Sequence, residues 1–162
     1  MTTTPSPRFF ELRSGFQSEV LEMVNRAQSE LLMFDPTYAD WPGQSAELAA
    51  ALEAFVKRGS NVRLHMVIDR NERVAADYPR LVNFLTRYQH VAECRALPER
   101  YANLAETMIV TDAASALRRP STTTYRGVAR VLDIEYAAAL RSRFMELWEA
   151  CHERFSPTTL GL

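Results

Sequence analysis

Apolar residues recur along the chain with two periods, which together predict alternating helices and strands. A spacing of three to four residues indicates helices that begin at Ser14, Ser45, Pro79 and Asp133. Short apolar runs bounded by turn residues indicate strands at 31–34, 61–69, 91–97, 107–111 and 115–118. Strand–helix–strand units form parallel crossovers, whereas the later strands leave no room for helices between them. We therefore expect a single α/β/α sandwich with a mixed, mostly parallel sheet between two helical layers.

Local signals at three helix starts support this order. Ser14 followed by Gln17 fits a capping box, in which the two side chains satisfy free backbone amides. Ser45 fits an N-cap with Glu47 at the positive end of the helix dipole, and Asp133 fits the N-cap of the last helix.

Segment 61–69 has the clearest strand pattern. Val62, Leu64, Met66 and Ile68 alternate with a second set of Arg63, His65 and Val67, so the two sets are expected on opposite faces of the sheet. His65 could act as a base if its face bordered a cleft. A histidine packed beneath a helix is the favoured interpretation.

The length of 162 residues fits one domain. Residues 1–13 lack an apolar face and are expected to form a flexible lead-in, 14–155 the domain, and 156–162 a tail. No apolar run approaches the ~20 residues of a membrane helix, so no contact with a membrane is expected. The start of the chain shows no signal-peptide pattern.

Composition narrows the chemistry. The net charge is −1, and 18 of the 19 basic residues are arginines, with Lys57 the single lysine. Five scattered glycines exclude a P-loop and a dinucleotide-binding motif, so no cofactor is expected. Cys94 and Cys151 have no partner at metal-ligand spacing, which favours two buried thiols in a reduced, cytoplasmic protein.

Four segments, in this order, resemble one half of the phospholipase D-like fold. They are "SELLMFDP", "LAAALEAFVKRGSNVRLHMVID", "TMIVTDAASALRR" and "DIEYAAALRSRFMELWEA". The likeness spans about residues 14–152 and is closest to a group of bacterial domains of unknown function, some of which follow a GNAT acetyltransferase domain. The resemblance implies the same fold. It also implies a possible homodimer, because members with a single motif resemble half of a two-fold active site.

The chain departs from this family at the catalytic motif, which is His-x-Lys, four residues, then Asp. In active members the His attacks phosphorus and the Lys binds phosphate oxygens. Anchoring the motif on Asp112 places Ala105 at the His position and Thr107 at the Lys position. Alanine supplies no nucleophile, and threonine supplies no charge for a phosphate. We therefore expect a non-catalytic module that binds a ligand or a partner. The alternative is a metal-dependent hydrolase or phosphodiesterase whose catalytic residues have moved.

The alternative of a metal-dependent hydrolase rests mainly on Asp35 and Asp69. Both follow apolar strands, and ligands of parallel sheets gather at the carboxyl ends of strands. Two carboxylates there could form an acid–base pair or bind a divalent cation, although aspartate is also a common turn residue after a strand. Tyr38 and Trp41 in the following loop could form a contact patch or fold back onto the core.

Two further groups of residues are candidates for ligand binding. Asn103 and Glu106 flank the vacated catalytic positions and could bind a polar ligand. Arg118 and Arg126 lie in a basic stretch with Tyr125, and arginine is suited to bidentate contacts with a phosphate-containing or other anionic ligand. The structural alternative for the first group is a surface loop that leads into a strand. For the second group it is a solvated hairpin. The net charge argues against nucleic-acid binding, although the arginines in this stretch leave it open.

Overall fold

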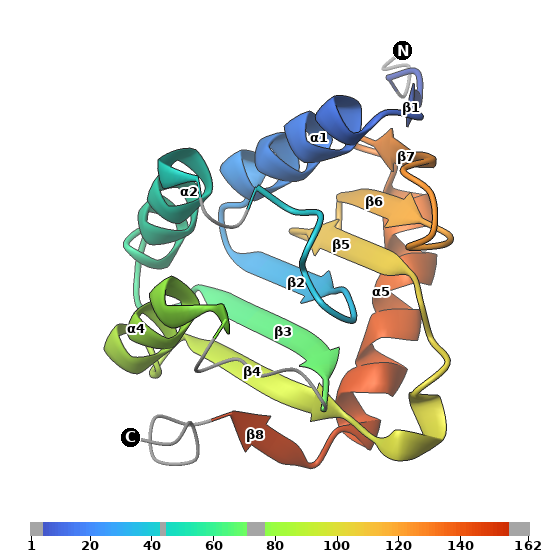
Figure 1. Cartoon of the computed structure of the whole chain (residues 1–162). Helices are drawn as coiled ribbons and strands as arrows, with labels where there is room; N and C mark the ends of the chain where they lie inside the picture. The colour runs from blue at the N-terminus through green and yellow to red at the C-terminus, as the bar shows by residue number, and fades with distance from the viewer. Residues whose placement is uncertain (1–4, 43–44, 71–76, 156–162) are drawn as a thin grey trace.

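The computed structural model describes residues 5–42, 45–70 and 77–155. Its strands form one sheet in the order β1-β7-β6-β5-β2-β3-β4-β8 (Figure 1). The strands are β1 Arg8–Phe10, β2 Glu30–Phe34, β3 Arg63–Asp69, β4 Ala92–Leu97, β5 Thr107–Thr111, β6 Ser115–Arg119, β7 Gly127–Arg130 and β8 Glu153–Phe155. The α-helices are α1 Arg13–Arg26, α2 Ala46–Val56, α4 Pro79–Arg87 and α5 Ile134–Ala150, and Glu99–Tyr101 is a 3₁₀ turn.

Helices cover both faces of the sheet, as the alternating apolar pattern predicts. Helices α1, α2 and α4 lie on one face and α5 on the other (Figure 1). In β2, Leu31 and Met33 join the core beneath α1, α2 and α4, while Leu32 and Phe34 join the core beneath α5. The expected α/β/α sandwich is confirmed. No helix in the described segments is long and apolar enough to span a membrane.

The sheet is mixed, as expected, but it is not mostly parallel. Pairs β2–β3 and β3–β4 are parallel, whereas the other five pairings among the described strands are antiparallel. Parallel pairing needs a long crossover, and only α2 and α4 provide one between neighbouring strands. The remaining strands reach their neighbours through short turns or through segments that reverse the direction of the chain. Both kinds of connection favour antiparallel pairing.

Three short strands, β1, β7 and β8, are absent from the sequence prediction. Strand β1 lies inside the expected lead-in of residues 1–13 and pairs with β7, while β8 pairs with β4 near the end of the domain. Each has only three or four residues, too few to show a period of two, and their sequences are polar at several positions. The expected tail, 156–162, lies outside the described residues.

Two of the three expected helix caps are confirmed. The Ser45 side chain accepts a hydrogen bond from the Leu48 amide, and Asp133 accepts one from the Tyr136 amide. The capping box at Ser14 is wrong, because α1 begins at Arg13 with no side-chain cap. Strand β1 ends three residues before α1, so strand pairing rather than a cap fixes how the chain enters this helix.

Asp112, the anchor of the family resemblance, ties two turns together. It occupies the left-handed region with φ 57°, between β5 and β6. Its carboxylate accepts hydrogen bonds from the amides of Gln28, Ser29 and Glu30 at 2.8–3.1 Å. Gln28 and Ser29 precede β2 and Glu30 is its first residue, so Asp112 fixes the β5–β6 turn against the start of the central strand.

Candidate functional site

Strand pairing gathers three polar side chains in one row on the α1 face of the sheet. Phe34 pairs with Met108 in the antiparallel β2–β5 ladder, which brings Asp35 beside the start of β5. Thr107 pairs with Arg119 in the β5–β6 ladder. Asp35, Thr107 and Arg119 are at most 1% exposed. The carboxyl end of β2 therefore meets the vacated lysine position in the interior of the protein.

The loop after β2 wraps around the Asp35 carboxylate. Oxygen Oδ1 accepts hydrogen bonds from the amides of Thr37 and Tyr38 at 3.0 and 2.9 Å. Oxygen Oδ2 accepts one from the indole Nε1 of Trp41 at 3.0 Å. Trp41 is 4% exposed, so of its two expected positions it takes the one folded onto the core.

Arg119 occupies the space beside Thr107. Its Nε donates to the Thr107 hydroxyl at 3.0 Å, and its Nη2 donates to Asp35 Oδ2 at 3.1 Å. Its Nη1 pairs with Asp40 at 2.9 Å, and its guanidinium lies 4.3 Å above the ring of Phe16. The Thr107 hydroxyl in turn donates to Asp35 Oδ2 at 2.5 Å. We call Asp35, Asp40, Thr107 and Arg119 the Asp35–Arg119 network.

The charge of this network opposes anion binding. Two carboxylates face one guanidinium, so its formal charge is −1. A phosphate would need to displace both carboxylates to reach the nitrogens of Arg119, leaving Asp35 as a buried charge without its cation. Thr107, at the position where the resemblance requires a phosphate-binding lysine, is thus enclosed by the internal ion pairs of Arg119 with Asp35 and Asp40. Ala105, at the histidine position, is exposed and offers only a methyl group.

A second cluster lies on the opposite, α5 face. Glu106 is 3% exposed and pairs with Arg118 at 3.1 Å and with Arg143 of α5. Tyr136 packs nearby, and burial raises the pKa of its phenol against the opposing charges of Arg118 and Arg130. We call Glu106, Arg118 and Arg143 the Glu106 cluster. Two partly exposed guanidinium groups share one buried carboxylate, so the cluster has a surplus of one positive charge.

A groove of about 470 Å³ opens beside this cluster, between β1, the start of β7 and the end of β6. Arg118 and Tyr136 line it, together with exposed Arg126 and the loop residues Ser121 and Thr124. Arg126 has no carboxylate within ion-pair distance among the described residues. The exposed carboxylate of Glu11 also lines the groove, which offers an anion the guanidinium of Arg126 and loop hydroxyl groups on its other side.

The remaining predicted residues are dispersed. Asp69 ends β3 and is half-buried, and Asn103 is exposed in the loop before β5. Tyr125 packs against the core on the α1 face. Tyr38 is buried with its hydroxyl 3.0 and 2.9 Å from carbonyl oxygens of β2 and β3, and burial raises its pKa well above the usual value. Of the predicted set, the structure brings together Asp35 with Tyr38, and Glu106 with Arg118 and Arg126.

The described residues give little support to a relocated metal site. Within them, no three His, Cys, Asp or Glu side chains are placed to hold a metal ion. Both oxygens of Asp35 are occupied by protein donors. Cys94 and Cys151 are buried and unbridged, and burial raises the pKa of the Cys151 thiol to about 11.

His65 is packed beneath α5, as its place in the strand pattern predicts. Its ring stacks on Trp148 with centroids 4.1 Å apart and planes 5° apart. Burial lowers the pKa of the imidazole, which favours the neutral form. This half-buried histidine belongs to neither cluster and packs against Trp148 of α5.

Arg119 is the residue that sequence reasoning missed. The basic stretch presents it beside Arg118 as one of several solvated arginines. Strand alternation contains the missing signal, because Arg119 has the same parity in β6 as buried Leu117. A strand side chain that shares its parity with a core residue points inward, so Arg119 was a candidate for a buried ion pair.

Comparisons with known proteins agree with this fold. A family model described as a domain of unknown function, DUF7931, matches residues 13–156. No curated protein matches the chain.

Among solved structures, the archaeal chromatin protein TrmBL2, described with a novel mode of DNA binding, superposes with a TM-score of 0.68 at 18% identity. That match covers 92% of this chain and 54% of TrmBL2, so the chain spans about half of that protein. The phospholipase D family member Nuc from Salmonella typhimurium gives 0.66 at 15% identity over 93% of this chain and 98% of Nuc. NucT from Helicobacter pylori gives 0.63 at 11% identity, covering 91% and 98%. The expected phospholipase D-like fold is therefore confirmed.

Proposed function

Because the chain belongs to the DUF7931 family of domains of unknown function and has a phospholipase D-like fold, we propose that it is a non-catalytic module that binds an anionic ligand. The Asp35–Arg119 network carries the first half of this proposal. Thr107 is fully buried, and its hydroxyl is already hydrogen-bonded to Asp35 and Arg119. A substrate phosphate would find neither a nucleophile at Ala105 nor a cation at Thr107.

The groove beside the Glu106 cluster supports the second half. It combines the exposed guanidinium of Arg126 with Arg118, whose only carboxylate partner, among the described residues, is shared with Arg143. Guanidinium groups bind phosphate oxygens in bidentate geometry, and nearby hydroxyl groups add hydrogen bonds. A phosphate-containing ligand fits this chemistry better than it fits the closed network on the other face.

We expect the purified protein to release no p-nitrophenol from bis-p-nitrophenyl phosphate above the rate in buffer. The reason is the missing nucleophile, since general hydrogen bonding alone does not split a phosphodiester. An Asp69→Asn variant purified in parallel is the control for a contaminating enzyme. Release that follows the protein through purification and falls in Asp69→Asn would instead support the hydrolase with relocated catalytic residues.

We expect inorganic pyrophosphate to bind in the groove with an affinity that Arg126→Met lowers by about tenfold. A charge-assisted hydrogen bond contributes about 1.5–3 kcal/mol, and 1.4 kcal/mol corresponds to a tenfold change. Titration calorimetry at low salt measures the affinity. Arg58→Met, which removes an exposed arginine outside the groove, should leave it unchanged. Equal affinities for the two variants, or no binding at millimolar pyrophosphate, would refute this part of the proposal.

Nucleic acid is a second candidate ligand, favoured by the similarity to TrmBL2, a protein described as binding DNA. The net charge of −1 opposes it. Fluorescence anisotropy with labelled DNA in the same two variants separates the cases. Binding that weakens with salt and in Arg126→Met would assign the groove to a nucleic-acid backbone. A homodimer, implied by the family resemblance, stays a prediction that light scattering measures.

A further inference from the structure

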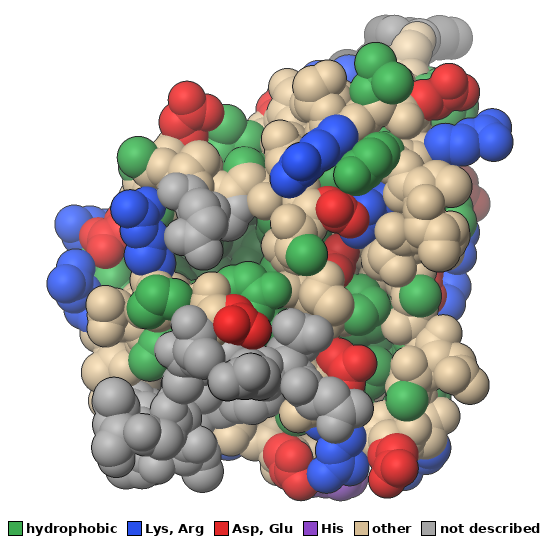
Figure 2. Space-filling view, viewed as in Figure 1, with side chains coloured by type: hydrophobic (Ala, Val, Ile, Leu, Met, Phe, Trp, Pro, Cys, Tyr) green, Lys and Arg blue, Asp and Glu red, His purple; other side chains and the backbone are tan. Residues whose placement is uncertain are grey.

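A cavity of about 390 Å³ lies between α2 and α4, above β2 and β3. Apolar side chains form its floor and walls: Met33, Met66, Leu48, Leu52, Leu81 and Phe84. Hydrophobic side chains are visible in the hollow between the two helices (Figure 2). Its volume falls within the roughly 300–1,000 Å³ of small-molecule sites. Protein interiors are otherwise close-packed, so an apolar space of this size marks a place for a ligand.

The hydroxyl and indole groups that line this cavity are already bound within the protein. The Tyr38 hydroxyl lies 3.0 and 2.9 Å from carbonyl oxygens of β2 and β3, and the Trp41 indole donates to Asp35 at 3.0 Å. The Tyr78 hydroxyl donates to a carbonyl oxygen in the loop after β2. A buried water needs two to four polar partners, and these groups offer few free ones. An apolar cavity of roughly 150 Å³ stays dry and binds benzene, so this larger space suits an apolar molecule.

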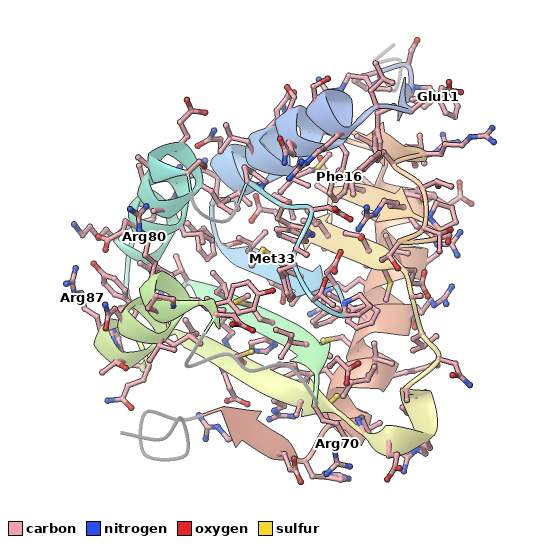
Figure 3. The ribbon with its side chains drawn as sticks, in the orientation of Figure 1. Glu11, Phe16, Met33, Arg70, Arg80 and Arg87 are labelled. Carbon is pink, nitrogen blue, oxygen red and sulfur yellow. The ribbon has the colours of Figure 1, made fainter. Side chains whose placement is uncertain are left out.

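The charged groups at the mouth of the cavity have partners as well. Arg80 and Arg87 extend from α4, and Met33 lies on the strand beneath (Figure 3). Glu53 of α2 is the one carboxylate among the lining residues of the described chain. It pairs with Arg87 and with Lys57, which lies outside the cavity, both at 3.2 Å. Arg80 also has an interaction partner. Among the described lining residues, the mouth therefore offers an ionic ligand no charge that lacks a partner.

We propose that this cavity binds an uncharged, largely apolar small molecule. The ligand lies over Met33 and Met66, whose unbranched side chains repack easily around ligands of different shape. The rings of Tyr38 and Trp41 add aromatic contacts. An ionic ligand would leave water for a lining whose charges already have partners, which is unfavourable. The site shares no residue with the groove beside the Glu106 cluster, so either proposal can fail while the other stands.

Three probes that share a naphthalene ring and differ in charge test the proposal in the unaltered protein. At neutral pH, 1-naphthalenemethanol is uncharged, 1-naphthoate is an anion and 1-naphthylmethylammonium is a cation. We expect the alcohol to bind at least about tenfold more tightly than either ion in titration calorimetry, because burial of an ion without a new partner is unfavourable. It should also raise Tm, since a ligand that binds only the folded state stabilises that state. Either ion binding as tightly as the alcohol, or no binding of the alcohol at millimolar concentration, would overturn the proposal.

Two alanines on α2 give a matched test of where the probe binds. Ala49 lines the cavity, whereas Ala50 is exposed and outside it. Ala49→Phe places a ring in the space, and we expect it to weaken binding of 1-naphthalenemethanol at least about tenfold. Ala50→Phe should bind the alcohol as the unaltered protein does, and circular dichroism checks that both variants are folded. Equal affinities of the two folded variants would show that the probe binds elsewhere, and the assignment of this cavity would be wrong.

Discussion

Replacement of Arg119 by methionine is expected to lower the free energy of unfolding by about 3–5 kcal/mol, because it breaks a buried ion pair from one side. Methionine keeps the length of the side chain but removes the cation between Asp35 and Asp40. Asp35 would remain 1% exposed with its negative charge uncompensated. The contact of the guanidinium with the ring of Phe16 would be lost as well.

Urea denaturation followed by circular dichroism measures this effect. Arg63→Met is the matched control, because Arg63 is a strand arginine that is exposed rather than buried, and a change within about 0.5 kcal/mol is expected there. A double-mutant cycle with Asp35→Asn should show that the two losses are not additive, since both substitutions remove the same pair. A loss below about 1 kcal/mol in Arg119→Met would mean that Arg119 is not structural, and its nitrogens would again be candidates for ligand binding.

The main features of the fold follow from the sequence because they depend on local repetition. Alternation in segment 61–69 places Leu64 and Met66 on one face, covered by α1, α2 and α4, and His65 on the other face against α5, as observed. Hydroxyl and carboxylate caps at Ser45 and Asp133 mark two helix starts correctly. These signals each involve a few neighbouring residues, so no tertiary information is needed to interpret them.

The candidate sites depend on contacts between distant residues, which the sequence does not display. Asp35 and Arg119 are 84 residues apart, and only the order of β2, β5 and β6 in the sheet brings them together. The same holds for Glu106, which lies just before β5, and Arg143, which lies in α5. The direction of each arginine also depends on strand parity. Arg118 and Arg119 are neighbours in sequence, yet one joins a surface cluster and the other a buried network.

This separation explains how a phospholipase D-like framework can persist without its catalytic residues. Asp112 still fixes the β5–β6 turn through three backbone amides, so its role in folding does not depend on a histidine or lysine nearby. The space at the lysine position is filled by Arg119 from the neighbouring strand. The single lysine of the chain, Lys57, lies at the end of α2 and pairs with Glu53.

Thr107→Lys restores the residue type that the family motif requires. We expect it to lower the free energy of unfolding by about 3 kcal/mol or more. The introduced ammonium group would lie beside the Arg119 guanidinium in a position that is 0% exposed. Like charges in the interior and extra methylene groups in a packed core both raise the free energy of the folded state. Combined with Ala105→His, the substitution should still release no p-nitrophenol from bis-p-nitrophenyl phosphate, because Asp35 and Asp40 lie beside this position and repel a phosphate.

The decisive comparison is Thr107→Lys combined with Arg119→Met. In this double variant one buried cation again faces Asp35, so it should be more stable than the sum of the two single losses predicts, by at least about 1.5 kcal/mol. Thr107→Val is the control for the lost hydroxyl, with an expected cost of about 1–2 kcal/mol and no compensation by Arg119→Met. Strictly additive losses, or a Thr107→Lys protein as stable as the unaltered one, would contradict the role assigned to Arg119. Compensation in the charge-restoring pair alone would show that electrostatic neutralisation of Asp35, rather than packing, is what the Asp35–Arg119 network supplies at this end of the sheet.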